Sequence, residues 1–430
     1  MSTRDDMLDA ANIAVLTLPQ MVEYTNQVLI PVGGSALFAG MSGMGKTQAT
    51  IQNIKINQDA DADFGGAFCN WSNMEAIDAR GLPRVTELVS SYGIPPWMCP
   101  VPELGLRGAF PALCPENLRG DPATWTAELA HAYATAAEQL ATGKLIPYTR
   151  GIVGIDEALQ TLEDSMLLVL AQLADEHRIG QWGVPMEGWA VVMLTNRMQD
   201  QAGVRELHAH TRNRMSIWEV AHDPEATLDY WYGIGMNDHF RYFASVEPQT
   251  VFTAKVPEGQ RQFCTPRSWH RAHNEVLMWL HNVDRVPVEE LTTCMVPHEH
   301  AMLPSLIAAR CGSAAAVRFT DYLRNAELRP EYTEIVKAPM KARLPGQSAV
   351  IRGVIEMLSD KVNLGDLDKV CTYMKREDMP TTMQSIFCHK LTRRPHMPVD
   401  ALYQHGGFMS LVDTAGPSVR QMIFAAEYKS

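Results

Sequence analysis

The chain has 430 residues, of which 46% are hydrophobic and 20% are charged, so it is long enough for roughly two or three domains with separate cores. Its net charge of −12 argues against a generally basic nucleic-acid-binding protein, although a local basic groove is still compatible with it. No apolar run approaches a membrane span, the acidic N-terminus is not a signal peptide, and the eight cysteines form no Cys-x-x-Cys pair; we expect a reduced, cytoplasmic protein without a zinc site.

The first predicted elements lead into a glycine-rich loop. Residues Leu18–Leu29 predict a short amphipathic helix, which Pro31 and the glycines after it are expected to end. An apolar run, Ala36–Ala39, predicts a buried strand that passes directly into the pattern Gly-x-x-x-x-Gly-Lys-Thr and then into a helix over Gln48–Ile56. The candidate nucleotide-binding residues are Gly40, Met41, Ser42, Gly43, Met44, Gly45, Lys46, Thr47 and Gln48.

This pattern is the phosphate-binding loop, and its residue types explain why. The glycines let the backbone wrap a phosphate, and several N–H groups point inward at the start of the next helix. Lys46 can reach the β- and γ-phosphates of a nucleotide, and the Thr47 hydroxyl can ligate Mg²⁺. The alternative interpretation is a glycine-rich turn between two core elements.

The next part of the chain predicts a strand and a long irregular connection. Gly66–Trp71 is typical of a strand, and the polar segment Met74–Pro83 after it is typical of a loop. Residues 95–122 are dense in Pro and Gly and predict an irregular insertion. Trp125–Thr142, rich in Ala, Leu and Glu, predicts a helix.

Another apolar strand, over 151–155, ends in Asp156 and Glu157. A carboxylate at the carboxyl end of a neighbouring parallel strand lies near the phosphates, so Asp156 can hold Mg²⁺ through water. Glu157 can then polarise the attacking water as a general base. The alternative is that Asp156 merely caps a following helix over Leu159–Ala174.

The strand that follows carries a polar residue at its end. Ile179–Trp189, with its glycines and Pro185, predicts a hairpin, and the apolar strand after it ends in Thr195 and Asn196. If this strand lies between the two motif strands, Asn196 can touch the γ-phosphate or the attacking water. On sequence alone, Asn196 as the start of a turn is nearly as good an interpretation.

Three arginines in the next part of the chain are candidate functional residues. Arg212 and Arg214 lie at a helix end before the strand Ser216–Val220 and can reach a neighbouring subunit's γ-phosphate, although from spacing alone a solvated cation is favoured. Helices dominate from Asp223 onward. Thr265 and Pro266 predict a helix start, which places Arg267 in a first turn where the macrodipole disfavours a cation and hints at another use.

The last part of the chain predicts helices without a motif. Two helices surround Gly312, and Pro330, Pro339 and Pro345 indicate a boundary. The predicted helices are Leu303–Ala309, Ala314–Leu323, Val350–Leu358, Leu367–Met374, Met383–Leu391 and Val419–Glu427.

Taken in order, these segments resemble the AAA+ ATPases, and among them the MoxR-like branch of bacteria and their phages. Gly40–Thr47 is similar to Walker A, Ile152–Glu157 to Walker B and Leu194–Arg197 to sensor 1. The less common motifs are Met74–Pro83 after the second strand, the arginine-finger segment Ala202–Met215, the sensor 2 segment Phe263–Trp269 and the lid helices Leu306–Leu323.

The resemblance implies a P-loop NTPase fold of the α/β class, in which helices flank a parallel sheet and an α-helical lid follows. It places the ATPase core at 1–222, with an insertion at about 95–150, and the lid at 223–335. Residues 336–430 would form a helical C-terminal region of unknown role. The insertion and residues 340–430 depart from the family pattern.

The resemblance also implies a Mg²⁺-dependent ATPase that assembles into a ring, usually hexameric, and remodels or activates a partner protein. Such partners often carry a von Willebrand factor A domain. Lys46, Thr47, Asp156, Glu157 and Asn196 would act within one subunit. Arg214, with Arg212 as the alternative, would be the trans arginine finger of the next subunit, and Arg267 would be the cis sensor.

Three other functions stay open at this point. A nucleic-acid motor or loader on the same core would need a basic, aromatic-lined face, and the predicted hairpin offers only Arg178 and Trp182. A small-molecule kinase would act as a monomer with an acceptor pocket. A nucleotide-binding structural protein without turnover would leave Glu157 idle.

Overall fold

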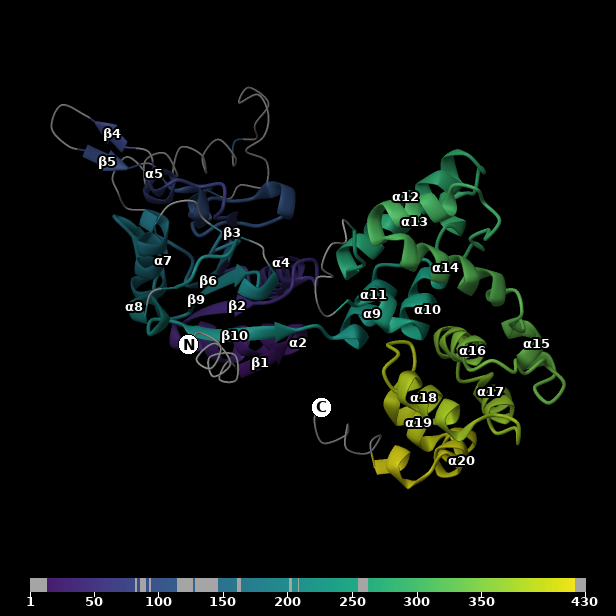
Figure 1. Cartoon of the computed structure of the whole chain (residues 1–430). Helices are drawn as coiled ribbons and strands as arrows, with labels where there is room; N and C mark the ends of the chain where they lie inside the picture. The colour runs from purple at the N-terminus through teal and green to yellow at the C-terminus, as the bar shows by residue number, and fades with distance from the viewer. Residues whose placement is uncertain are drawn as a thin grey trace, which may run out of the picture. The chain divides into compact units, whose positions relative to one another are not determined.

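The computed structural model describes residues 14–81, 83–85, 90–92, 94–113, 127, 146–160, 164–200, 203–207, 209–253 and 262–421. These residues form two compact units, which separate between Asp223 and Pro224 (Figure 1). The predicted helix Trp125–Thr142 lies outside the described residues, except for Ala127. No helix in the described part of the chain is both long and apolar enough to cross a membrane.

The first unit is built on a six-stranded sheet in which every neighbouring pair is parallel, so the predicted α/β class is confirmed (Figure 1). The register pairs Ala39 with Thr195 and Asn70 with Asp156, so the carboxyl ends of these strands meet at one edge. The strand order is β1 (Ala14–Thr17), β10 (Ser216–Ala221), β2 (Ser35–Ala39), β9 (Trp189–Thr195), β6 (Arg150–Asp156) and β3 (Phe64–Asn70).

Both faces of this sheet are covered, because alternate residues of each strand point to opposite sides. On one face Leu37, Met193 and their neighbours pack with α7 (Asp164–Glu176). On the other face Phe38 and its neighbours pack with α4 (Lys46–Ala60). This burial on both sides explains why the strands read as continuous apolar runs in the sequence.

The helical segment before β2 extends further than the sequence predicts. It consists of α2 (Leu18–Tyr24), a π turn (Thr25–Leu29) and α3 (Ile30–Val32). Pro31 does not end it, because a proline without an N–H fits the early position that it holds in α3. Gly33, with φ of 63°, ends the segment instead.

The Pro-rich segment covers the edge of the sheet at β3. Over 94–113 it contains the 3₁₀ turns Pro96–Met98, Pro102–Leu104 and Pro111–Leu113, which is the irregular backbone that its composition predicts. Gly66 and Gly108 exchange two backbone hydrogen bonds of 2.8 Å, so part of the open edge is paired.

The described part of the second unit is helical. One hydrophobic core runs through it from Trp231 to Val419, so residues 224–335 and 336–421 share a single interior. Helices α19 (Val399–Gln404) and α20 (Gly406–Ala415) have no counterpart among the predicted helices. The other helices are α9 (Pro224–Gly233), α10 (Asp238–Val246), α11 (Pro248–Val251), α12 (Pro266–Asn282), α13 (Leu303–Cys311), α14 (Ser313–Ala326), α15 (Tyr332–Lys337), α16 (Ser348–Lys361), α17 (Leu367–Met374) and α18 (Thr381–Leu391).

Candidate functional site

The candidate site begins with the loop that joins β2 to α4. Gly43 and Gly45 have φ of 80° and 109°, values in the left-handed region that L-residues with a Cβ rarely adopt. Gly45 is the N-cap of α4, which has no side-chain cap and no acidic residue in its first turn. A helix start without a side-chain cap presents backbone N–H groups that suit an anion.

Lys46 is the first residue of α4, and its ammonium group is folded back into the loop. The residue is 6% exposed, and Nζ donates hydrogen bonds of 2.6 Å to the Gly40 carbonyl and 3.0 Å to the Met41 carbonyl. Met41 and Met44 are buried in the core below. The two methionines thus anchor the loop to the core, and the Lys46 ammonium group places a positive charge within the loop.

Thr47 and Asp156 meet although they are far apart in the sequence. The Thr47 hydroxyl donates a hydrogen bond of 2.8 Å to Asp156 Oδ2, and Asp156 Oδ1 accepts one of 3.0 Å from the Glu157 N–H. Residues 157–160 are not helical, so Asp156 does not cap α7. A hydroxyl and a carboxylate side by side are oxygen ligands of the kind that Mg²⁺ prefers.

Glu157 is held by two residues that the sequence patterns did not single out. Asn70, the last residue of β3, donates a hydrogen bond of 3.0 Å to Glu157 Oε2, and the Ser72 hydroxyl donates one of 2.5 Å to the same oxygen. Glu157 itself has a left-handed φ of 53°, a strained value for a residue with a Cβ. The contacts and the strained backbone direct this carboxylate to one place.

Asn196 follows β9, the strand that lies between β2 and β6 as expected. Its side chain is half-buried. The tip of β9 is tied to both neighbouring loops, because the Gly40 N–H donates to the Thr195 carbonyl at 3.1 Å and the Ala158 N–H to the Leu194 carbonyl at 2.9 Å. Three strand ends therefore bring Lys46, Asp156 and Asn196 to one edge of the sheet.

The structure does not bring the three candidate arginines into this group. Arg214 forms an ion pair of 3.4 Å with Asp175, and Arg212 forms one of 3.7 Å with Glu206; both arginine side chains are more than a third exposed. Arg267 belongs to the second unit, where it is exposed in the first turn of α12. Thr265 caps that turn by accepting a hydrogen bond of 3.2 Å from the Ser268 N–H, as predicted.

The site fits a nucleotide with a metal ion better than a metal ion alone. In the part of the chain that the structure describes, no group of three or more His, Cys, Asp or Glu side chains could hold a metal. Thr47 and Asp156 supply too few ligands by themselves, so a bound Mg²⁺ would need phosphate oxygens or water as well.

Comparison with known proteins adds no assignment. No protein-family model matches the chain, and a search of curated proteins found no match either.

Proposed function

We propose that this chain is an ATPase of the AAA+ type, which binds ATP with Mg²⁺ at Gly40–Thr47 and hydrolyses it. The observation that carries the proposal is the 2.8 Å hydrogen bond between Thr47 and Asp156, with Glu157 fixed beside it. A glycine-rich turn that only joined core elements would have no need for a hydroxyl, two carboxylates and a buried ammonium group at the same edge.

Each of the four site residues has a distinct role in the proposed reaction. Lys46 would exchange its two carbonyl partners for phosphate oxygens, and Thr47 and Asp156 would hold the metal ion. Mg²⁺, when bound, neutralises phosphate charge. Glu157 would accept the proton of the attacking water, and its fixed carboxylate reduces the reorganisation that this step needs.

The AAA+ assignment is supported by the strand order. β9 lies between the strand of the phosphate-binding loop and the strand of the two carboxylates, and it carries a polar residue, Asn196, at its tip. That is the place where a side chain can sense the γ-phosphate. The helical second unit after the sheet is compatible with a lid that carries Arg267.

A ring of several copies follows from the same proposal. Arg214 has only a partly exposed ion pair with Asp175, which is worth little, so a phosphate on a neighbouring copy can replace this partner easily. Hydrolysis would then depend on assembly. The ATPase would drive the remodelling or activation of a partner protein, for which a von Willebrand factor A domain is the candidate that the MoxR resemblance implies.

The proposal is tested by measuring phosphate release from ATP with and without Mg²⁺. Wild-type protein should hydrolyse ATP only with Mg²⁺, and Lys46→Ala should neither bind nor hydrolyse it. Lys55→Ala is the matched control, because Lys55 is an exposed lysine on the same helix. Hydrolysis by Lys46→Ala at the wild-type rate would refute the site.

Two further measurements separate the proposal from its rivals. Strong stimulation of hydrolysis by DNA or RNA would favour a nucleic-acid motor or loader. Particles that stay monomeric with ATP and Mg²⁺ in size-exclusion chromatography would contradict the ring and favour a kinase.

A further inference from the structure

A cavity of about 220 Å³ lies within the second unit, beside the start of α16. We refer to it as the α16 cavity. α14 contributes Arg318, Tyr322 and Asn325 to its lining, α16 contributes Ala349 and Val350, and Arg329 comes from the connection between them. The cavity lies outside the candidate nucleotide site, and no step of the proposed ATPase uses it.

Arg329 is built into this cavity. Its guanidinium carbon lies 4.5 Å from the centre of the Tyr322 ring, and a Cβ added at Gly353 would come within 2.5 Å of the same carbon. Glycine destabilises the middle of a helix, so its presence in α16 is best explained by the space that Arg329 needs. Gly353 thus leaves room beside α16 for the Arg329 guanidinium.

The polar atoms around Arg329 are incompletely satisfied. Tyr322 is only 7% exposed, and neither its hydroxyl nor Arg329 Nε has a hydrogen-bond partner of acceptable geometry in the described structure. Among the described residues, Arg329 has no ion pair with a carboxylate. The two acidic residues of the lining are already paired, Glu247 with Arg318 at 3.0 Å and Asp321 with Arg324 at 3.0 Å.

The start of α16 adds to the positive character of the cavity. Its N-cap, Gln347, makes no side-chain capping bond, and its first turn contains no acidic residue. Ala349 and Val350 of this first turn line the cavity, so the free N–H groups of the helix lie next to it. An uncapped helix start and an unpaired guanidinium both call for an anion.

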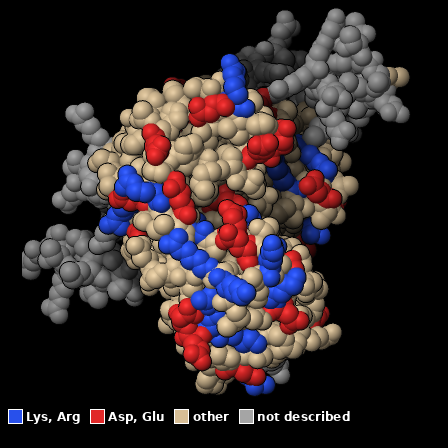
Figure 2. All heavy atoms as spheres, turned by 90° about the vertical axis from the view of Figure 1, so that its right-hand side faces the viewer, with Lys and Arg blue, Asp and Glu red and all other residues tan. Residues whose placement is uncertain are grey.

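The chain segment that contributes Ala349 and Val350 to the lining is rich in cations. No Asp or Glu occurs between residues 335 and 355, whereas Lys337, Lys341, Arg343 and Arg352 are all exposed, and none has an ion pair in the described structure. Arg352 follows Ala349 by one helical turn, so it lies on the same side of α16. On the face drawn in Figure 2, Lys and Arg side chains are interspersed with Asp and Glu side chains.

We propose that the α16 cavity and the acid-free segment 335–355 bind an acidic segment of a partner protein, with one carboxylate entering the cavity to meet Arg329. A carboxylate matches the planar fork of a guanidinium, and flanking Asp or Glu side chains match the exposed cations. Nucleic acid is less favoured, because the segment contains no aromatic residue on which a base could stack and the chain carries a net charge of −12.

The proposal is tested by fluorescence anisotropy with the full chain and a fluorescein-labelled oligoglutamate peptide at low ionic strength. The peptide should bind and be released by salt, and an oligoglutamine peptide of the same length should not bind. A duplex DNA of similar charge serves as the competing probe. Tighter binding of the DNA than of the peptide would overturn the assignment to an acidic protein segment.

Two glycine variants make the sharpest comparison. Gly353→Ala should displace the guanidinium and weaken peptide binding about tenfold, the loss of one good charge-assisted contact. Gly346→Ala is the matched control, because no heavy atom lies within 4 Å of an added Cβ there. Equal peptide affinity in these two variants would overturn the role of the cavity.

Charge variants provide an independent check. Arg329→Gln should also weaken binding about tenfold, and Lys341→Gln with Arg343→Gln should weaken it severalfold without unfolding the protein, because both side chains are exposed. Arg285→Gln, at another exposed cation of the same unit, should bind as wild type does. Wild-type affinity both in Arg329→Gln and in the Lys341→Gln, Arg343→Gln double variant would refute the proposal. ATP hydrolysis should be unchanged in them, so failure here is distinguishable from failure of the ATPase proposal.

Discussion

Replacing Thr47 by Val removes one hydroxyl from the candidate site and keeps the branched shape of the side chain. The hydroxyl donates the 2.8 Å hydrogen bond to Asp156 Oδ2. Without nucleotide, the change should lower the stability of the first unit only modestly, because Asp156 is half-buried and water can replace the donor.

The effect on nucleotide binding should be larger and should depend on Mg²⁺. A hydrogen bond to a charged group is worth about 1.5–3 kcal/mol, and the loss of a comparable contact would weaken binding of the Mg²⁺–ATP complex by roughly 10- to 100-fold. At a ligand concentration of about 100 times the wild-type Kd, ligand stabilises the wild type by about 2.7 kcal/mol. The variant would keep roughly 0.4–1.4 kcal/mol of that stabilisation.

Thermal unfolding with a non-hydrolysable ATP analogue measures this difference. For a unit of this size, 1 kcal/mol corresponds to about 2–4 °C in Tm, so the wild type should gain roughly 5–10 °C with Mg²⁺ and the variant roughly 1–5 °C. Thr47→Ser, which keeps the hydroxyl, is the control. An equal Mg²⁺-dependent gain in Thr47→Val and wild type would refute the pairing of Thr47 and Asp156 as a metal site.

The remaining predictions concern turnover, assembly and pH. Glu157→Gln should bind Mg²⁺–ATP but hydrolyse it about 10²- to 10⁴-fold more slowly, since it lacks the base; single-turnover hydrolysis near the wild-type rate would contradict this role. Arg214→Ala should bind ATP and lose about 10³-fold in steady-state hydrolysis, whereas Arg212→Ala should not; the reverse result would exchange the two roles. Burial lowers the pKa of His239 and of His273 to about 4, below the ordinary value near 6.5. As the pH falls, these histidines become protonated in the unfolded state before they do in the folded state. The free energy of unfolding of the second unit should therefore be highest above pH 6.5 and decrease as the pH falls towards 4. Equal urea midpoints at pH 7.5 and pH 5 would contradict this.

The strand ends were predictable because each joins a strong local pattern to a polar residue. An apolar run followed by Gly-Lys-Thr, by Asp-Glu or by Thr-Asn indicates where a buried parallel strand ends, and the sheet then brings Lys46, Asp156 and Asn196 to one edge. That β9 lies between β2 and β6 was a condition of the predicted role of Asn196, and the strand order meets it.

The partners of Glu157 were not predictable from the sequence. Asn70 and Ser72 lie more than eighty residues before Glu157 and carry no motif, and only the parallel pairing of Asn70 with Asp156 brings them near. A polar residue at the end of a strand was the one available signal. The roles proposed for Arg214 and Arg267 would likewise require contacts between units or between copies, which local patterns do not encode.

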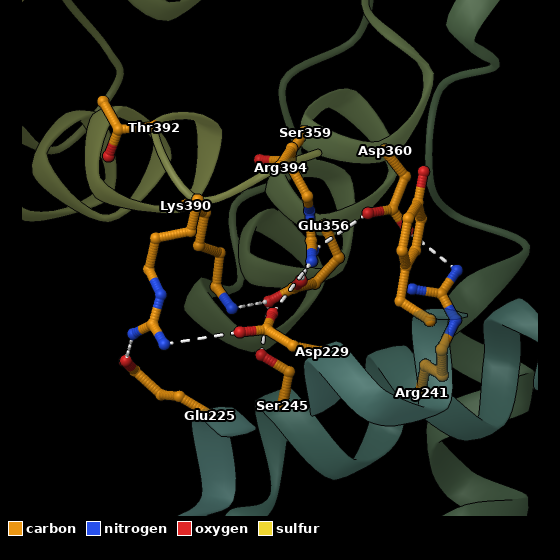
Figure 3. Close-up of polar contacts among 12 residues, drawn as sticks. Glu225, Asp229, Arg241, Ser245, Glu356, Ser359, Asp360, Lys390, Thr392 and Arg394 are labelled. Carbon is orange, nitrogen blue, oxygen red and sulfur yellow. Dashed lines mark hydrogen bonds and ion pairs between the residues drawn. The ribbon is translucent and has the colours of Figure 1, made fainter. Parts of the chain in front are cut away.

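The buried ion pairs of the second unit were likewise not predictable from the sequence. Arg394 and Glu356 are both about 95% buried and lie 3.3 Å apart, and Asp360 contacts Arg394 at 2.9 Å and Arg241 at 2.8 Å (Figure 3). Charged residues in a helical sequence predict a solvated face. These charges are buried because groups on α10, α16 and the segment after α18 neutralise one another.

The shared interior of the second unit has a consequence for any attempt to shorten the chain. A protein that ended at residue 335 would lose Asp360, one of the two acidic partners of Arg241, and it would expose the apolar side chains that face residues 336–421. Arg241 would still have Asp238 beside it, but the loss of one partner of a buried ion pair and of the shared apolar core would together remove a large part of the stability of a domain. Loss of activity in such a deletion would therefore report a collapsed second unit, and single substitutions on the surface of α16 are the informative way to learn what the C-terminal residues recognise.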